Sequence, residues 1–162
     1  MRRDLKTDLK KLFLFAKKLK VAVWRRRADF IAKKRKGAIA YYSPSERKIY
    51  LSTSITDIEK LICVFAHELG HVIYFDRRKK DKTLLDILAV VGCFVKCVEE
   101  KRKVPRALKK FVLDLERIAF DEAEKIISLF SISVTLGVQR QLRTKSLRAV
   151  AKSISDFNRR LR

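Results

Sequence analysis

The segment His67-Glu68-Leu69-Gly70-His71, HELGH in one-letter code, decides how the rest of the chain is interpreted. It has the pattern H-E-x-x-H and contains both histidines of the 162-residue chain. Two imidazoles four residues apart lie on one face of a helix and can both bind Zn²⁺. Glu68, beside the first of them, can act as a general base on a water molecule at the metal. A third protein ligand must then come from another part of the chain.

The residues around the motif predict a helix with two different faces. Thr56 or Asp57 supplies an N-cap, and the helix runs from residue 58 to about residue 75. At about 100° per residue, one side carries the histidines and the opposite side is apolar and suited to burial. The histidine side also carries Cys63, Val64 and Tyr74, and the apolar side carries Ile58, Leu61, Phe65, Leu69 and Val72.

The sequence before the motif predicts one amphipathic helix and a small antiparallel sheet of about three strands. The helix covers residues 4–20 and has a Lys-rich outer face. A strand over residues 20–27 is followed by a loop or short turn through residues 33–37. Two further strands, over residues 38–42 and 48–52, are separated by turn residues and form a hairpin.

The sequence after the motif predicts a charged loop over residues 77–82 and then three more helices. Thr83 caps the first of these helices, and its middle, residues 87–95, is apolar on all sides, which predicts burial between neighbouring elements. Pro105 is placed to start the second. We expect the helices to span residues 83–101, 106–130 and 138–162, the last with a basic outer face. The predicted fold is a single α+β domain, residues 1–162, that is predominantly helical, with the sheet packed on the HELGH helix.

The composition predicts a strongly positive, cytoplasmic protein. Net charge is +22, from 40 Lys and Arg against 18 Asp and Glu, and this attracts nucleic acid, acidic proteins or an anionic membrane surface. The few Asn and Gln and the many charged residues resemble the amino-acid composition of hyperthermophile proteins. That composition explains the high density of charged residues better than the excess of positive over negative charge. The longest apolar stretch is shorter than the roughly 20 residues that cross a bilayer, and the N-terminus lacks the features of a secretory signal.

Three cysteines, Cys63, Cys93 and Cys97, have apolar helical surroundings in the sequence. We expect all three to be buried thiols in a reducing compartment. Cys63 lies one turn before His67 and is an alternative neighbour of the metal, although a Cys ligand is unusual beside H-E-x-x-H.

Two glutamates on the predicted helix over residues 106–130 compete to be the third ligand. Glu116 and Glu122 each lie about 60° from the centre of its apolar stripe, on opposite flanks. Ala119 lies near that centre and Ala123 lies on the Glu116 side, so that side can approach another helix closely. Periodicity alone does not choose between the two carboxylates.

The order of these motifs resembles a known family. A hairpin strand, a helix ending in residues 65–71 (FAHELGH) and a later helix with residues 116–123 (ERIAFDEA) resemble the ImmA/IrrE-type metallopeptidases. They are also similar to the minigluzincins, small gluzincins of archaea and mobile elements. These families carry E-x-x-A followed by Asn, Asp or an aromatic residue, and Glu116-x-x-Ala119-Phe120 matches the aromatic variant. The resemblance covers roughly residues 38–130.

The resemblance implies a zincin-like fold in which His67, His71 and Glu116 bind zinc and Glu68 is the general base. The chain also departs from the family. The gap from His71 to the E-x-x-A motif is longer than usual, and Phe120 replaces a polar residue that in many members supports a metal-binding histidine. Glu99 and Glu100 lie nearer the usual gap but lack the Ala that should follow, and they remain candidates for the third ligand.

The leading functional hypothesis is an intracellular zinc-dependent endopeptidase whose protein substrate is a repressor or another nucleic-acid-associated protein. An extended peptide would add to a sheet edge at residues 48–52. Tyr41, Tyr42 and Tyr74 are candidates for stabilising the oxyanion, although a packing role is commoner for any one aromatic residue.

Two further hypotheses follow from the charge. One is a nucleic-acid-binding protein with a structural or vestigial zinc site; the second, ranked lower, is attachment to an anionic membrane through the basic end helices. The basic clusters that would contact nucleic acid are residues 25–27, 33–36, 77–80, 101–103 and 159–160.

Overall fold

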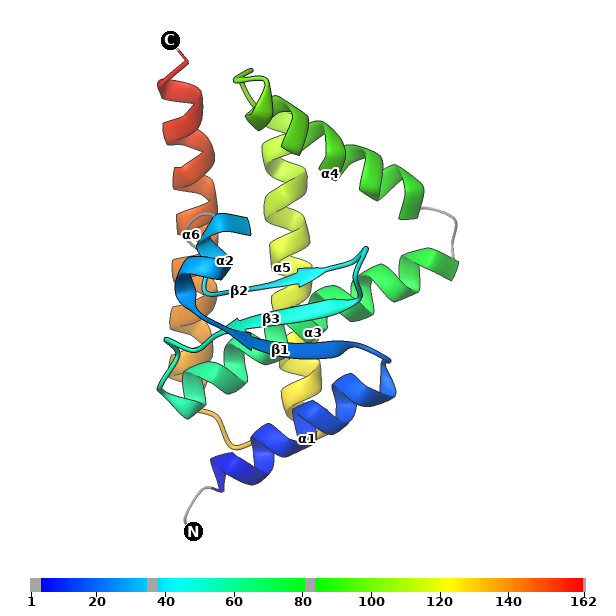
Figure 1. Ribbon diagram of the computed structural model, residues 1–162. Helices are drawn as coiled ribbons and strands as arrows, with labels where there is room; N and C mark the ends of the chain where they lie inside the picture. The colour runs from blue at the N-terminus through cyan, green and yellow to red at the C-terminus, as the bar shows by residue number, and fades with distance from the viewer. Residues whose placement is uncertain (1–3, 35–37, 81–83, 162) are drawn as a thin grey trace.

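Six helices and three strands make up the computed structural model, which describes residues 4–34, 38–80 and 84–161 (Figure 1). The fold is α+β and mostly helical with one small sheet, as the sequence predicts. In chain order the elements are α1 (Leu5–Lys18), β1 (Ala22–Arg26), α2 (Ala28–Lys34), β2 (Ala40–Ser43), β3 (Lys48–Ser52), α3 (Ile58–Lys80), α4 (Leu84–Glu99), α5 (Arg106–Leu129) and α6 (Leu136–Arg159).

The sheet is mixed rather than wholly antiparallel, and its strand order is β1-β3-β2. β2 and β3 form the predicted antiparallel hairpin, in which Tyr41 pairs with Tyr50. β1 lies parallel to β3, with Trp24 opposite Tyr50. Parallel neighbours need a crossover connection, and the helix α2 forms part of it where the sequence predicts only a loop or turn. Residues 35–37 of that predicted loop lie outside the described residues.

The position of β3 in the centre of the sheet corrects the predicted peptide-binding edge. β3 is paired on both sides, so residues 48–52 offer no free edge to an extended peptide. The two edge strands are β1 and β2. Because side chains alternate along a strand, Ala40 and Tyr42 of β2 join the main core, whereas Tyr41 packs with Tyr50 on the other face.

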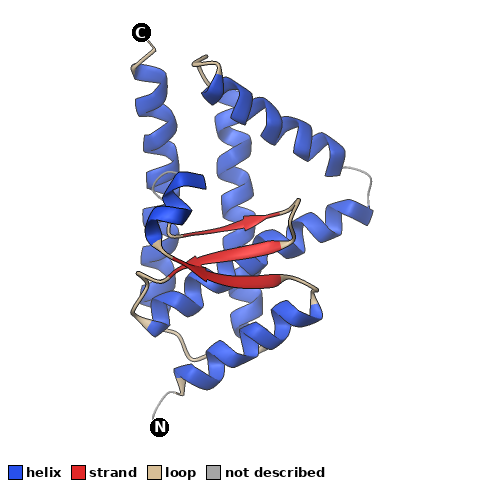
Figure 2. Cartoon of the chain, in the orientation of Figure 1, coloured by secondary structure: helices blue, strands red, loops and turns tan. Residues whose placement is uncertain are grey.

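Helix α3 is the centre of the core, between the sheet and α5 (Figures 1 and 2). Asp57 caps it, because its carboxylate accepts a hydrogen bond from the backbone N–H of Lys60. Phe65, Leu69 and Val72, on the predicted apolar face, are fully buried. The histidine face is covered as well, and every residue from 61 to 70 is buried.

Helix α3 continues to Lys80, so residues 77–80 of the predicted charged loop are helical. Two contacts accompany this extension: Arg77 pairs with Glu122 of α5, and the guanidinium of Arg78 lies over the ring of Tyr74, one turn earlier. Residues 81–83, including the predicted cap Thr83, lie outside the described residues.

The prediction that the middle of α4 is buried on all sides is wrong. α4 runs from the end of α3 back to the start of α5 (Figure 2), and Val90, Phe94 and Cys97 pack in one cluster with residues of α5 and α6. Cys97 is buried there with Val104, Leu108 and Ile154, the last from α6. Ala89, Gly92, Cys93, Val95 and Val98 are exposed. Cys93 is therefore not the buried thiol that its apolar neighbours in the sequence suggest.

The loop between α4 and α5 is fastened to the end of α6 by the single asparagine of the chain. The Val104 N–H donates to Asn158 Oδ1 at 2.8 Å, and Asn158 Nδ2 donates to the Val104 carbonyl at 3.0 Å. One side chain thus satisfies both backbone groups of a buried residue. Among the described helices, none is long and apolar enough to cross a membrane.

Candidate metal centre

The side chains of His67, His71 and Glu116 converge where α3 crosses α5. His67 Nε2 lies 3.2 Å from Glu116 Oε2, and His71 Nε2 lies 3.9 Å from Glu116 Oε1. One ligand atom from each of the three residues can be chosen so that all lie within 4.8 Å of one another. In the part of the chain that the structure describes, this is the one cluster of three or more such side chains that could hold a metal ion.

The three side chains lie close enough together to hold one metal ion. Imidazole and carboxylate ligands bond zinc at about 2.0–2.2 Å, which places two ligands of a tetrahedral ion about 3.3 Å apart. The separation of His67 from Glu116, 3.2 Å, matches that value, and the separation of His71 from the other Glu116 oxygen, 3.9 Å, is longer. Two imidazoles and one carboxylate leave the fourth position open, as catalytic zinc sites do.

The close approach of α3 and α5 depends on two small residues. A Cβ atom added to Gly70 would lie 2.2 Å from the carbonyl oxygen of Ala119, and 3.0 Å and 3.1 Å from its carbonyl carbon and Cα. The backbone of α5 therefore occupies the space that a side chain at position 70 would need. Glu116 lies one turn before Ala119, so this contact brings its carboxylate up to the histidines.

The ring of Phe120 packs on His67, with 4.0 Å between ring centroids and 33° between ring planes. His67 Nδ1 is buried and has no hydrogen-bond partner among the described residues. A polar residue commonly orients a metal-binding histidine through that atom. Here the aromatic contact with Phe120 holds the ring instead.

Glu68 is 5% exposed, so its carboxylate is shielded from bulk water next to the metal ligands. It follows His67 directly on α3, and helical geometry turns it about 100° away from the first ligand. A carboxylate in such a place can take a proton from a reactant held at the metal.

Glu122 is as buried as Glu116 but faces different partners. Its Oε1 accepts hydrogen bonds at 2.8 Å from Arg77 and from Lys125. Burial alone would raise the pKa of Glu122, but these two cations outweigh it and lower the pKa overall. Glu99 and Glu100, the remaining candidates for the third ligand, are exposed at the end of α4. None of these three glutamates belongs to the metal cluster.

The three candidate oxyanion tyrosines lie in packed surroundings. Tyr41 stacks on Tyr50 at 4.8 Å, on the face of the sheet away from the main core. Tyr42 packs against Phe75 of α3, and Tyr74 contacts both Phe75 and Arg78. Burial raises the pKa of Tyr41 and of Tyr42.

Cys63 is buried one turn before His67 and is not part of the metal cluster. Burial raises the pKa of its thiol to about 12, with smaller contributions from the carboxylates of Glu59 and Asp57. At pH 8 about one molecule in 10⁴ then carries the reactive thiolate.

We expect iodoacetamide to alkylate the exposed Cys93 much faster than Cys63, as followed by mass spectrometry of peptides. Equal rates would contradict the burial of Cys63.

Comparison of the chain with protein-family models, with curated proteins and with solved structures finds no match. The three converging side chains and the HELGH motif are therefore the features of the chain that point to a function.

Proposed function

We propose that the protein is a zinc-dependent endopeptidase of the gluzincin type. The observation that carries the proposal is the convergence of both motif histidines with Glu116, in a chain that places Glu68 directly after the first of them. H-E-x-x-H with a downstream glutamate ligand is the arrangement of metallopeptidases that hydrolyse peptide bonds at zinc.

The proposed roles follow from where each side chain lies. His67, His71 and Glu116 hold the ion, which when bound supplies Lewis-acid chemistry to a peptide carbonyl and to water. Glu68 takes the proton of the attacking water and passes it to the leaving amine. The burial of Glu68 strengthens its electrostatic interaction with charge that develops in the transition state.

We assign peptide binding to the free edge of β2 in place of residues 48–52. The Ser52 N–H donates to the Ile39 carbonyl, which identifies that pair as hydrogen-bonded across the hairpin. Hydrogen-bonded and non-hydrogen-bonded pairs alternate, so the backbone groups of Ala40 and Tyr42 point away from β3. An extended peptide can pair with them, on the strand from which Tyr42 contacts Phe75 of α3.

Glu68→Gln tests the proposal because it removes the base and keeps the shape of the side chain. Loss of a general base reduces the rate by about 10²–10⁴-fold, so we expect cleavage of an unfolded protein substrate to fall by that factor. Zinc content, measured by atomic absorption, should stay at the wild-type level.

The matched control is Asp114→Asn, a similar substitution at a partly exposed carboxylate on α5 that pairs with Arg117 on the surface. The Asp114→Asn variant should cleave the substrate at the wild-type rate. A chelator should inactivate both the wild type and this variant, and added zinc should restore their activity. Undiminished cleavage by Glu68→Gln would refute the proposed mechanism. Zinc binding without cleavage by the wild type would favour a structural site.

A further inference from the structure

One side of α6 carries a row of cations with helical spacing. Lys145, Arg148, Lys152 and Arg159 are all exposed, and at about 100° per residue they fall within about 60° of one another. We call these four residues the α6 basic stripe. α6 as a whole contains six Lys and Arg and a single acid, Asp156.

The charges of this stripe are not used to hold the fold together. Arg143, on another side of α6, pairs with Asp121 and Glu124 of α5 and so has a structural role. Among the described residues, Lys145, Arg148 and Lys152 have no ion-pair partner within 4.0 Å. Arg159 has one weak contact, 3.8 Å from Asp156. Four clustered cations with one acid beside them present a strongly positive surface.

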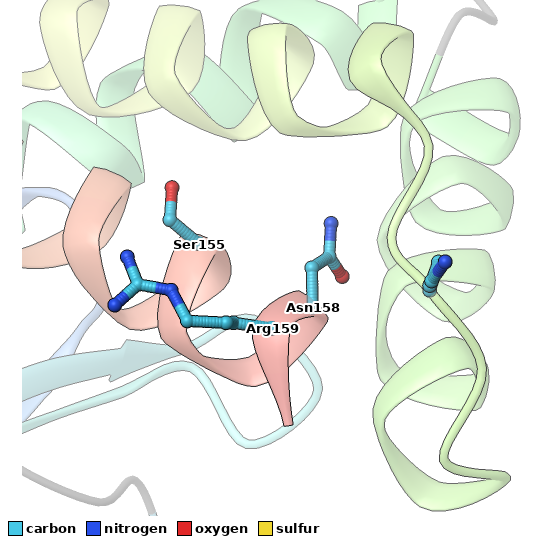
Figure 3. A pocket seen from close by; sticks show the side chains of 4 residues that line it. Ser155, Asn158 and Arg159 are labelled. Carbon is cyan, nitrogen blue, oxygen red and sulfur yellow. The ribbon is translucent and has the colours of Figure 1, made fainter. Parts of the chain in front are cut away.

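The stripe ends in a pocket to which a second basic cluster contributes. Lys103, from the loop between α4 and α5, lines this pocket with Ser155, Asn158 and Arg159, around a volume of about 470 Å³ (Figure 3). The pocket wall is held in place, because Asn158 binds both backbone groups of Val104. Ser155 accepts a hydrogen bond from Lys109 Nζ at 2.8 Å, which brings a further cation to the wall. Clusters far apart in the sequence thus meet at one end of the molecule.

We propose that the α6 basic stripe and this pocket bind duplex DNA through its phosphates. The stripe spans fourteen residue steps, or about 21 Å of helix, and duplex DNA carries one negative charge per about 1.7 Å of its axis. A straight row of cations on a rigid helix therefore runs along a length of duplex that carries about a dozen phosphate charges on its two strands. Lys103 and Arg159 approach a phosphate from two sides of the pocket.

The chemistry of the stripe favours a duplex over a single strand. Binding of single strands relies on exposed aromatic rings on which bases stack. The single aromatic residue of α6, Phe157, packs into the core cluster that contains Val104 and Ile154. The stripe thus offers contacts to the backbone and none to unstacked bases, which predicts binding that is independent of sequence. This inference does not depend on the proposed peptidase activity.

Two variants with the same net charge test the proposal. The stripe variant carries Lys145→Gln, Arg148→Gln, Lys152→Gln and Arg159→Gln. The control carries Lys6→Gln, Lys10→Gln, Lys17→Gln and Lys18→Gln on the exposed side of α1. Binding of a fluorescent 20-base-pair DNA duplex is followed by anisotropy at several salt concentrations, and circular dichroism confirms that both variants are folded.

We expect the stripe variant to bind at least about 100-fold more weakly at 0.1 M salt. Its slope of log K against log salt should be shallower by about 3.6, because four phosphate contacts are lost. The control should bind like the wild type, and Lys103→Gln alone should reduce the slope by about 0.9. Equal weakening of both four-site variants would show diffuse attraction and overturn the proposal.

Two further ligands separate other polyanions from duplex DNA. Vesicles of phosphatidylserine and phosphatidylcholine are tested by flotation, and a poly-dT single strand is tested by anisotropy. Tight, stripe-dependent binding to vesicles with weak binding to DNA would assign the surface to a membrane. A clear preference for the single strand would also contradict the assignment to a duplex.

Discussion

Replacing Gly70 with alanine is expected to push α3 and α5 apart and to destabilise the protein by about 3 kcal/mol. The added Cβ would lie 2.2 Å from the carbonyl oxygen of Ala119, far inside van der Waals contact. All three of the nearest atoms belong to the backbone of α5, so no side chain can rotate out of the way. The helices must separate by about 1 Å to reach an ordinary carbon–oxygen contact.

This separation would also damage the metal site. Glu116 is one turn from Ala119 and moves with it, whereas the histidines stay with α3. A displacement of about 1 Å is large compared with the tolerance of a metal site. We therefore expect Gly70→Ala to lower both the urea midpoint and the zinc affinity, measured by competition with a chromogenic chelator.

Gly92→Ala provides a matched control with the opposite expected sign. Gly92 is also inside a helix, but an added Cβ there meets nothing within 4 Å. Alanine should stabilise α4 by roughly 0.5–1 kcal/mol, because it restricts the unfolded chain and favours the helix. The Gly70 interpretation fails if Gly70→Ala unfolds at the wild-type urea concentration and retains zinc.

Glu116→Ala is expected to abolish tight zinc binding, whereas Glu122→Ala should leave it nearly unchanged. Loss of a residue that only supports a ligand reduces metal affinity by about 10–100-fold, so loss of a ligand should exceed about 100-fold. The two glutamates are suited to comparison, because each lies three residues from Ala119, on the same helix, and both are buried. They differ in their neighbours: Glu116 faces the two histidines, whereas Glu122 faces Arg77 and Lys125.

The control variant, Glu122→Ala, should change the stability of the protein and leave its zinc content unchanged. Glu122 is paired with Arg77, whose side chain is 62% exposed, so breaking the pair costs about 1 kcal/mol or less. Atomic absorption of the two purified variants separates the outcomes. Zinc loss by Glu122→Ala alone would assign the third ligand to that residue, and loss by neither would point to Glu99 or Glu100.

The elements with strong local signals are those that the sequence predicts well. The periodicity of α1, α3 and α5, the cap of α3 at Asp57 and the turn residues of the β2–β3 hairpin are local properties of the chain. They also place Glu116 and Glu122 correctly, since both turn inward. The choice between these two glutamates is not a local property, because it depends on which residue of α3 each one meets.

The true end of α3 shows why periodicity does not decide between the two glutamates. The sequence predicts a loop at residues 77–82, and in a loop Arg77 has no fixed position. In the structure Arg77 belongs to the helix and reaches Glu122, which leaves Glu116 as the inward carboxylate beside the histidines. For a related reason, the sequence does not predict the exposed face of α4 or the parallel pairing of β1. Apolar residues and β-prone residues identify an element, but they do not say how many neighbours it has.

For the proposed peptidase, the burial of the three candidate metal ligands would set a limit on turnover. The side chains of His67, His71 and Glu116 are only 9–12% exposed, which is too little for a polypeptide to reach them without movement of the protein. Binding of a polypeptide substrate, as proposed, would therefore include the free energy of opening. If one molecule in a hundred is open, the apparent affinity falls by about 100-fold. A partner that holds the open form would activate the proposed peptidase without touching the residues of the candidate site, and the rate of cleavage would report how often the protein opens.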